Sequence, residues 1–91
     1  MDKLITVVTR FPLPAGVTAD QVRVAFEEVA PRFRNVPGLV RKYFLRSDDC
    51  RTGGGVYLWN QEPAARAFMN DRVAPMIRAR FQVEPSVVSP K

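Results

Sequence analysis

The segment PGLVRKYFLRSDDCRTGGGVYLWNQEPAARAF, residues 37–68, encodes two β-strands and the start of a helix around three consecutive glycines. Leu39 to Ser47 and Thr52 to Trp59 are rich in β-branched and aromatic residues, which favour strands. The span between them is short and polar, so we expect an antiparallel hairpin and not a crossover. Asn60 is a suitable N-cap for the helix that follows.

The residues before this hairpin predict one strand and one helix. Lys3 to Arg10 is a β-branched strand, and the prolines and glycine after it forbid regular structure. Thr18 and Gln21 have the spacing of a capping box. Pro31 removes a backbone donor near the end of the helix, so we expect a kinked last turn. One helical face is formed by apolar residues at helical intervals, namely Val22, Phe26, Val29 and Phe33.

The residues after the hairpin predict a second helical segment and a final strand. The helix that carries Ala64 to Met69 is expected to break near Asn70 to Ala74, with a further short turn over Met76 to Arg80. Phe81 to Val88 is the expected last strand, with Pro85 at an edge position or bulge. The order βαββαβ predicts an α+β, ferredoxin-like single domain over residues 1–91, a four-stranded antiparallel sheet with both helices on one face.

Composition narrows the classes of function. The chain carries 14 Lys and Arg against 9 Asp and Glu, a net charge of +5, but the basic residues are scattered along it. Cys50 is the single cysteine and histidine is absent, which leaves no disulfide, no zinc-ligand spacing and no serine-type triad. The apolar run near the N-terminus is too short for a leader or a membrane span, so a cytoplasmic protein is expected.

The strands are apolar on both faces, although the helices can cover only one. Alternation places Leu39, Arg41, Tyr43 and Leu45 on one face and Val40, Lys42, Phe44 and Arg46 on the other. Neither face is cleanly polar. A sheet with an apolar outer face is most simply covered by another copy of itself, which predicts a homodimer through the sheet.

The hairpin and the helix after it resemble the YdhR-type branch of the antibiotic-biosynthesis-monooxygenase-like proteins, in the dimeric α/β-barrel superfamily. The resemblance rests on Pro37-Gly38, on Gly54 to Trp59 and on the helix that follows, and it extends over nearly the whole chain. It implies a dimeric α/β barrel with a ligand cavity between sheet and helices in each subunit. It also implies oxygen chemistry on a small aromatic or polycyclic substrate, with no metal, flavin or other cofactor.

Such chemistry requires a substrate that ionises to an electron-rich anion, which the protein must bind, desolvate and stabilise. Tyr43, Tyr57 and Trp59 are the candidate catalytic residues, and Asn35 and Arg41 are candidates for substrate binding. A hairpin that pairs Tyr43 with Tyr57 would gather the aromatic residues on one face, with Arg41 near Trp59.

These residues also have plain structural interpretations. Tyr57 and Trp59 can be core or interface aromatics, Asn35 can end the first helix, and Arg41 and Lys42 can face solvent. The run of glycines leads into a strand and lacks Walker spacing, so it indicates a β-bulge or a close backbone approach, not a phosphate loop.

Two further classes of function share this element order. An RNA-recognition motif would need aromatic residues where Gly54 and Val56 stand, and only Trp59 falls on an aromatic position, which argues against RNA. A non-catalytic dimer that binds a small ligand would use the same cavity without chemistry.

Overall fold

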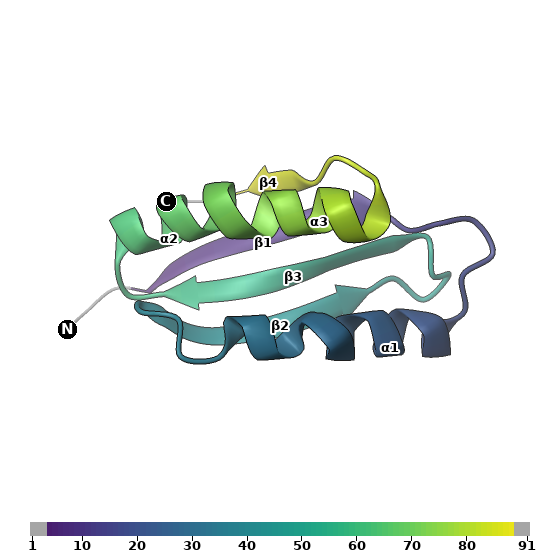
Figure 1. Cartoon of the computed structure of the whole chain (residues 1–91), viewed down its shortest axis with the longest axis horizontal. Coiled ribbons are helices and arrows are strands. Elements are labelled where there is room, and N and C mark those ends of the chain that lie inside the picture. Colours follow the sequence, from purple (N-terminus) through teal and green to yellow (C-terminus); the bar gives the residue numbers. More distant parts are fainter. Residues whose placement is uncertain (1–3, 89–91) are drawn as a thin grey trace.

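The computed structural model describes residues 4–88 and shows the ferredoxin-like order. Its four strands form one antiparallel sheet in the order β2-β3-β1-β4 (Figure 1). The predicted fold class is therefore confirmed; Lys3, the expected start of the first strand, lies outside the described residues. The strands are β1 (Ile5–Pro12), β2 (Leu39–Arg46), β3 (Thr52–Trp59) and β4 (Ser86–Val88).

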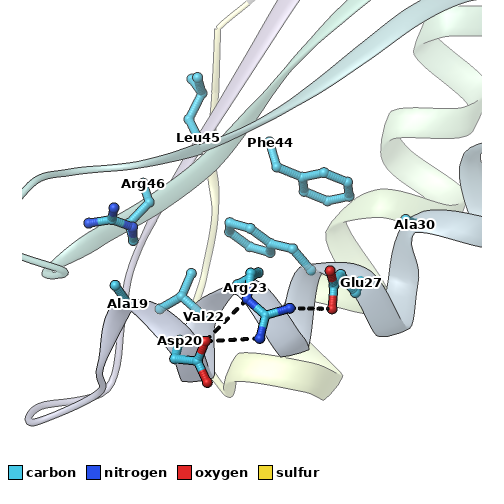
Figure 2. A pocket seen from close by; sticks show the side chains of 10 residues that line it. Ala19, Asp20, Val22, Arg23, Glu27, Ala30, Phe44, Leu45 and Arg46 are labelled. Carbon is cyan, nitrogen blue, oxygen red and sulfur yellow. Dashed lines mark hydrogen bonds and ion pairs between the residues drawn. The ribbon is translucent and has the colours of Figure 1, made fainter.

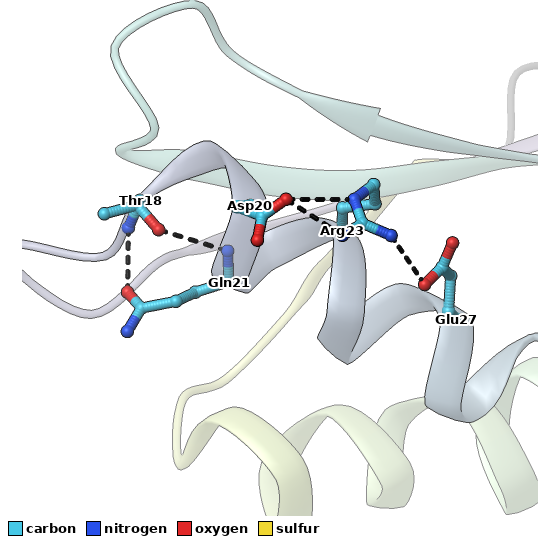
Figure 3. Close-up of polar contacts among 5 residues, drawn as sticks. All are labelled: Thr18, Asp20, Gln21, Arg23 and Glu27. Atoms are coloured by element: carbon cyan, nitrogen blue, oxygen red, sulfur yellow. Dashed lines mark hydrogen bonds and ion pairs between the residues drawn. The ribbon is translucent and has the colours of Figure 1, made fainter.

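The helices lie in two rows along the same face of the sheet (Figure 1). The first row is α1 (Ala19–Val29), followed by a 3-10 turn, η1 (Ala30–Phe33), that contains Pro31. Thr18 and Gln21 form the predicted capping box at the start of α1 (Figure 3). The second row consists of α2 (Glu62–Phe68), the π-helical turn η2 (Met69–Val73) and α3 (Ala74–Phe81).

One expectation about the C-terminal third was partly right and another was wrong. The α-helix is interrupted near the expected residues 70–74, but the chain stays helical there, because the π-helical turn η2 carries it from α2 into α3 and buries Met69 and Val73. Phe81 ends α3 and does not begin a strand. Gln82, with a φ of 59° in the left-handed region, stops the helix, and Pro85 leaves only the short β4.

A bulge in β2 sets which side chains face the helices. Leu39 pairs with Trp59 but Arg41 pairs with Leu58, so Val40 is the extra residue. The bulge reverses the side-chain alternation after Leu39 and turns Lys42 toward the helices. No bulge forms at the triple glycine, because the glycines pair in regular register on both sides. The bulge in β2 lies farther along the hairpin, opposite Leu58 and Trp59.

The core lies entirely between the sheet and the helices. Val7, Tyr57 and Trp59 from the strands pack against Phe26 of α1 and Ile77 of α3. The opposite side of the sheet has no helix over it (Figure 1). We call it the open face, and it carries Thr6, Val8, Arg41, Tyr43, Leu45, Val56 and Leu58.

Candidate functional site

The triple glycine forms the floor of the candidate site. A Cβ on Gly55 would overlap the Nζ atom of Lys42, and one on Gly53 would lie 3.0 Å from Phe11 and Leu13. Side chains from neighbouring strands therefore fold across β3 where it has none of its own. The close backbone approach predicted for the glycines is confirmed at Gly54, where a Cβ would overlap the backbone oxygen of Thr9. At Gly55 the group that approaches is the Lys42 amine.

The Lys42 side chain ends in a cage of aromatic rings. Its Nζ lies 3.5 Å from the ring centroid of Phe44, 4.5 Å from that of Tyr57 and 4.9 Å from that of Phe33. It donates one hydrogen bond of 3.3 Å to the backbone oxygen of Tyr43, and no salt bridge links it to any acidic side chain within residues 4–88. Burial lowers the pKa of Lys42 to about 7. The interpretation of Lys42 as a solvent-facing residue was wrong, because the bulge turns it inward.

Three more polar groups lie on this side of the sheet. Tyr57 is 2% exposed, and burial raises its pKa to about 12, so its hydroxyl stays protonated near neutral pH. The Thr9 hydroxyl opposes that rise slightly but makes no hydrogen bond of ordinary geometry. Trp59 is fully buried, and its Nε1 also has no partner within residues 4–88.

We call Thr9, Lys42, Tyr57 and Trp59 the inner cluster. Thr9 and Trp59 each leave a buried polar atom without a partner, at a cost of about 1–3 kcal/mol per group. Proteins rarely keep such groups without a reason, and a ligand that supplies the missing partner is one. The inner cluster contains no carboxylate, so its polar character comes from an amine, two hydroxyls and an indole N–H.

A small cavity adjoins the inner cluster. It has a volume of about 20 Å³, lies beside Thr9, Lys42 and Tyr57, and is closed by rings and aliphatic side chains from α1 and α3. The volume suits one water-sized molecule. An aromatic substrate needs more room, and the nearest larger space lies on the other side of Phe26 and Phe44.

That larger space is a groove between α1 and the edge strand β2 (Figure 2). The groove has a volume of about 530 Å³, and Phe26 and Phe44 line both it and the small cavity. Their rings stack with centroids 4.8 Å apart and an interplanar angle of 22°. This stacked pair therefore separates the groove from the inner cluster.

The acidic side chains along the groove are paired with Arg23. Arg23 of α1 bonds to Asp20 and to Glu27 at 2.9 Å each (Figures 2 and 3). On β2, Arg46 donates to the backbone oxygen of Ser47 at 3.0 Å and has no salt bridge within residues 4–88. The groove therefore combines an apolar lining, which suits an aromatic ring system, with one cation at its rim that no carboxylate of these residues pairs.

The structure separates the residues predicted for the site. Tyr57 and Trp59 share the helix-facing side, as expected, but Tyr57 pairs with Lys42 and not with Tyr43. Tyr43 and Arg41 point to the open face, where the guanidinium donates a 3.2 Å hydrogen bond to the Tyr43 hydroxyl. The bulge at Val40 and the length of the turn after β2 set this register, so Arg41 and Tyr43 do not lie in the inner cluster.

Asn35 lies apart from the inner cluster, just after η1. It is exposed, with a φ of 58°, and lines a separate pocket of about 540 Å³ next to Phe68 and Arg72. Phe68 connects this pocket to the interior, because its ring centroid is 5.5 Å from that of Trp59.

Lys42 and Thr9 were not predicted as site residues. The signal for both was the glycine run: Thr9 pairs with Gly55 across one side of β3, and Lys42 extends over Gly55 from the other. A strand residue without a side chain creates space that its cross-strand neighbours fill.

The part of the chain that the structure describes offers no group of three or more His, Cys, Asp or Glu side chains that could hold a metal ion. Within the same residues, no helix has the length and apolar character needed to cross a bilayer.

The open antiparallel sheet, with two helical rows on one face, has the fold of a solved structure described as a putative antibiotic biosynthesis monooxygenase from Bordetella bronchiseptica, with a TM-score of 0.72 at 17% identity, over 97% of this chain and 95% of that one. The family model described as Putative mono-oxygenase ydhR matches residues 8–87, and the chain belongs to this family. The family resemblance of the hairpin is therefore confirmed. Among curated proteins, none matches the sequence significantly.

Several solved structures have the same fold. A protein of unknown function from Nitrosomonas europaea, NE2512, has a TM-score of 0.77 at 18% identity, over 99% of this chain and 88% of that one. SnoaB, a cofactor-independent oxygenase from Streptomyces nogalater, has a TM-score of 0.66 at 20% identity, over 100% and 95%. The ActVA-Orf6 monooxygenase of Streptomyces coelicolor, in complex with nanaomycin D, has a TM-score of 0.67 at 27% identity, over 99% and 88%.

Proposed function

We propose that this chain is a cofactor-independent monooxygenase that oxidises a small, electron-rich aromatic or polycyclic compound between its sheet and its helices. The observation that carries the proposal is the inner cluster, a set of incompletely bonded polar groups among aromatic rings in a member of a mono-oxygenase family. The neighbours add support, because one is described as a cofactor-independent oxygenase and another was solved with nanaomycin D.

The inner cluster has the chemistry that this reaction needs. A substrate anion gives an electron to dioxygen, and the resulting oxygen species recombines with the substrate radical. For an anthrone-type carbon, O₂ supplies one oxygen atom to a new carbonyl group, and the other leaves as water with the two hydrogens lost from that carbon. The protein has to bind the anion out of water and stabilise its charge.

Two groups of the inner cluster stabilise the substrate anion in this proposal. The Tyr57 hydroxyl, which stays protonated, and the indole N–H of Trp59 donate hydrogen bonds to the substrate anion. Aromatic rings around them stack on the substrate. The substrate reaches the cluster from the groove, where Phe26 and Phe44 have to part to admit it.

We also propose that the protein is a homodimer through its open face. Tyr43 and Leu45 are 48% and 41% exposed, although one is aromatic and the other a large apolar residue. Val56 and Leu58 of the central strand continue this surface. A sheet face of this composition is normally covered by another layer, and a second copy of the chain supplies one.

Oxygen uptake tests the proposed activity. The protein, treated with a chelator and supplied with no flavin, is expected to consume oxygen with a panel of anthrones, quinols and phenols, and Trp59→Phe is expected to slow uptake by about tenfold or more because it removes one charge-stabilising donor. Tyr43→Phe on the open face is the matched control and should retain uptake. A panel that binds without oxygen uptake would support the non-catalytic ligand-binding dimer instead.

A further inference from the structure

The Lys42 amine is placed differently from an ordinary lysine. Long lysine side chains usually extend their charge into water, but this one ends over three ring faces and above Gly55. Of the side chains packed around it, β1 presents Thr9, β3 presents Tyr57, and α3 presents Met76 and Ile77.

No acidic side chain among residues 4–88 forms a salt bridge with this amine. Glu27, the carboxylate of α1 that lines the groove, is held by Arg23 at 2.9 Å. A purely structural lysine in such a place would gain from a carboxylate partner, because an unpaired buried charge is costly. The amine is instead held partly neutral by burial, with a pKa of about 7, and a neutral amine is a base.

The rings around Lys42 also indicate which part of a substrate would contact the amine. Phe44 covers Nζ at 3.5 Å and at the same time lines the groove. A substrate ring that enters from the groove and displaces Phe44 therefore brings its own substituents to the amine. Ring faces stabilise the ammonium form after it has gained a proton.

We propose that Lys42 is the base that takes the proton from an aromatic hydroxyl group of the substrate, which makes the substrate a hydroxyarene or its enol equivalent. In this step the O–H bond breaks, its electron pair stays on oxygen, and a new N–H bond forms on Nζ. The ammonium then pairs with the aryloxide in a site that contains no carboxylate. This proposal rests on the proposed function for the location of the substrate, but the step itself involves no oxygen.

The step can be observed without turnover. Under anaerobic conditions, 3-nitrophenol, a weaker acid than 4-nitrophenol, is titrated with the protein at a pH about one unit below the pKa of the free phenol, where the Lys42 amine is still largely neutral. The long-wavelength phenolate band is recorded. We expect the band to grow to saturation with the wild type. Lys42→Met, which keeps the apolar stem, should lower the bound phenolate fraction by about tenfold or more.

Two controls keep this experiment decisive. Nitroanisole, which has no proton to give, should bind equally to the wild type and to Lys42→Met, which shows that the variant is folded and its site intact. Arg41→Met removes a cation from the adjacent position on the open face and should leave the phenolate band unchanged.

The proposal is overturned if Lys42→Met gives the same phenolate band as the wild type, or if the wild type binds the nitrophenol only in its neutral form or not at all. Failure of the proposed function gives a different result: a Lys42-dependent phenolate band with no oxygen uptake from any substrate. Conversely, oxygen uptake that is unchanged in Lys42→Met would support the proposed oxygenase activity and would contradict the role of Lys42 as its base.

Discussion

The two faces of the sheet are built from the same strands but differ in how far their polar side chains are shielded from water. On the helix-facing side, Thr9, Tyr57 and Trp59 are buried and Lys42 is half-buried among rings, and two of the four leave a polar atom without a partner within residues 4–88. On the open face, polar groups such as Arg41 remain in contact with water. Lys42 and Tyr43 are sequence neighbours, yet only the lysine is shielded. Burial, and not residue type, therefore identifies the candidate site.

Replacing the buried tryptophan should produce the largest difference between the faces. Trp59→Ala is expected to lower the free energy of unfolding by about 3–5 kcal/mol, because it empties a fully buried site. Tyr43→Ala should act mainly through dimerisation, so its effect should depend on protein concentration. Urea denaturation at two protein concentrations checks both, and a concentration-independent loss in Tyr43→Ala would contradict the assignment of the open face.

The pH dependence of stability should distinguish Lys42 from Arg41. The folded-state pKa of Lys42, about 7, lies below its usual 10.5, so the unfolded chain binds more protons between these values. Stability contributed by this residue is therefore lowest below pH 7 and rises toward pH 10.5, by a few kcal/mol. Lys42→Met should remove this rise relative to the wild type, and Arg41→Met should not. Parallel pH profiles for the wild type and Lys42→Met would show that the amine is not buried.

The glycine floor predicts an intermediate effect. Gly55→Ala should cost about 1–3 kcal/mol, because the new Cβ would push the Lys42 amine out of its ring cage and would lie 3.1 Å from the backbone oxygen of Tyr43. Shortening the lysine should relieve the overlap, so a double-mutant cycle with Lys42→Ala is expected to show coupling of about 1 kcal/mol. Additive effects of the two substitutions would mean that the amine does not lie over Gly55.

The smallest effect should have the opposite sign. Thr9→Val removes a buried hydroxyl that has no partner and should raise the free energy of unfolding by up to about 1 kcal/mol. Thr6→Val, on the open face of the same strand, should change it by less than about 0.5 kcal/mol. Thermal melts at one pH are sufficient, and a loss of stability in Thr9→Val would show that the hydroxyl is bonded in the free protein.

The fold was predictable from sequence because its cues are local. Strand composition, the Thr18 capping box and the order of elements all depend on neighbouring residues, and the family-specific hairpin agrees with them. The site was only half predictable. Trp59 and Tyr57 share one strand, so their common face follows from alternation alone. Tyr43 and Lys42 depend on register across the hairpin, which one extra residue at Val40 reverses.

The single tryptophan allows the central claim to be tested directly. We expect that an anaerobic titration with a hydroxyanthracene, followed by ¹H–¹⁵N NMR, will shift the one indole N–H resonance of Trp59 to saturation, because the proposed function places the ligand between sheet and helices. The backbone amides of Arg41 and Tyr43 on the open face should shift much less. An indole resonance that stays fixed while the open-face amides move would place the ligand on the other side of the sheet and contradict the account.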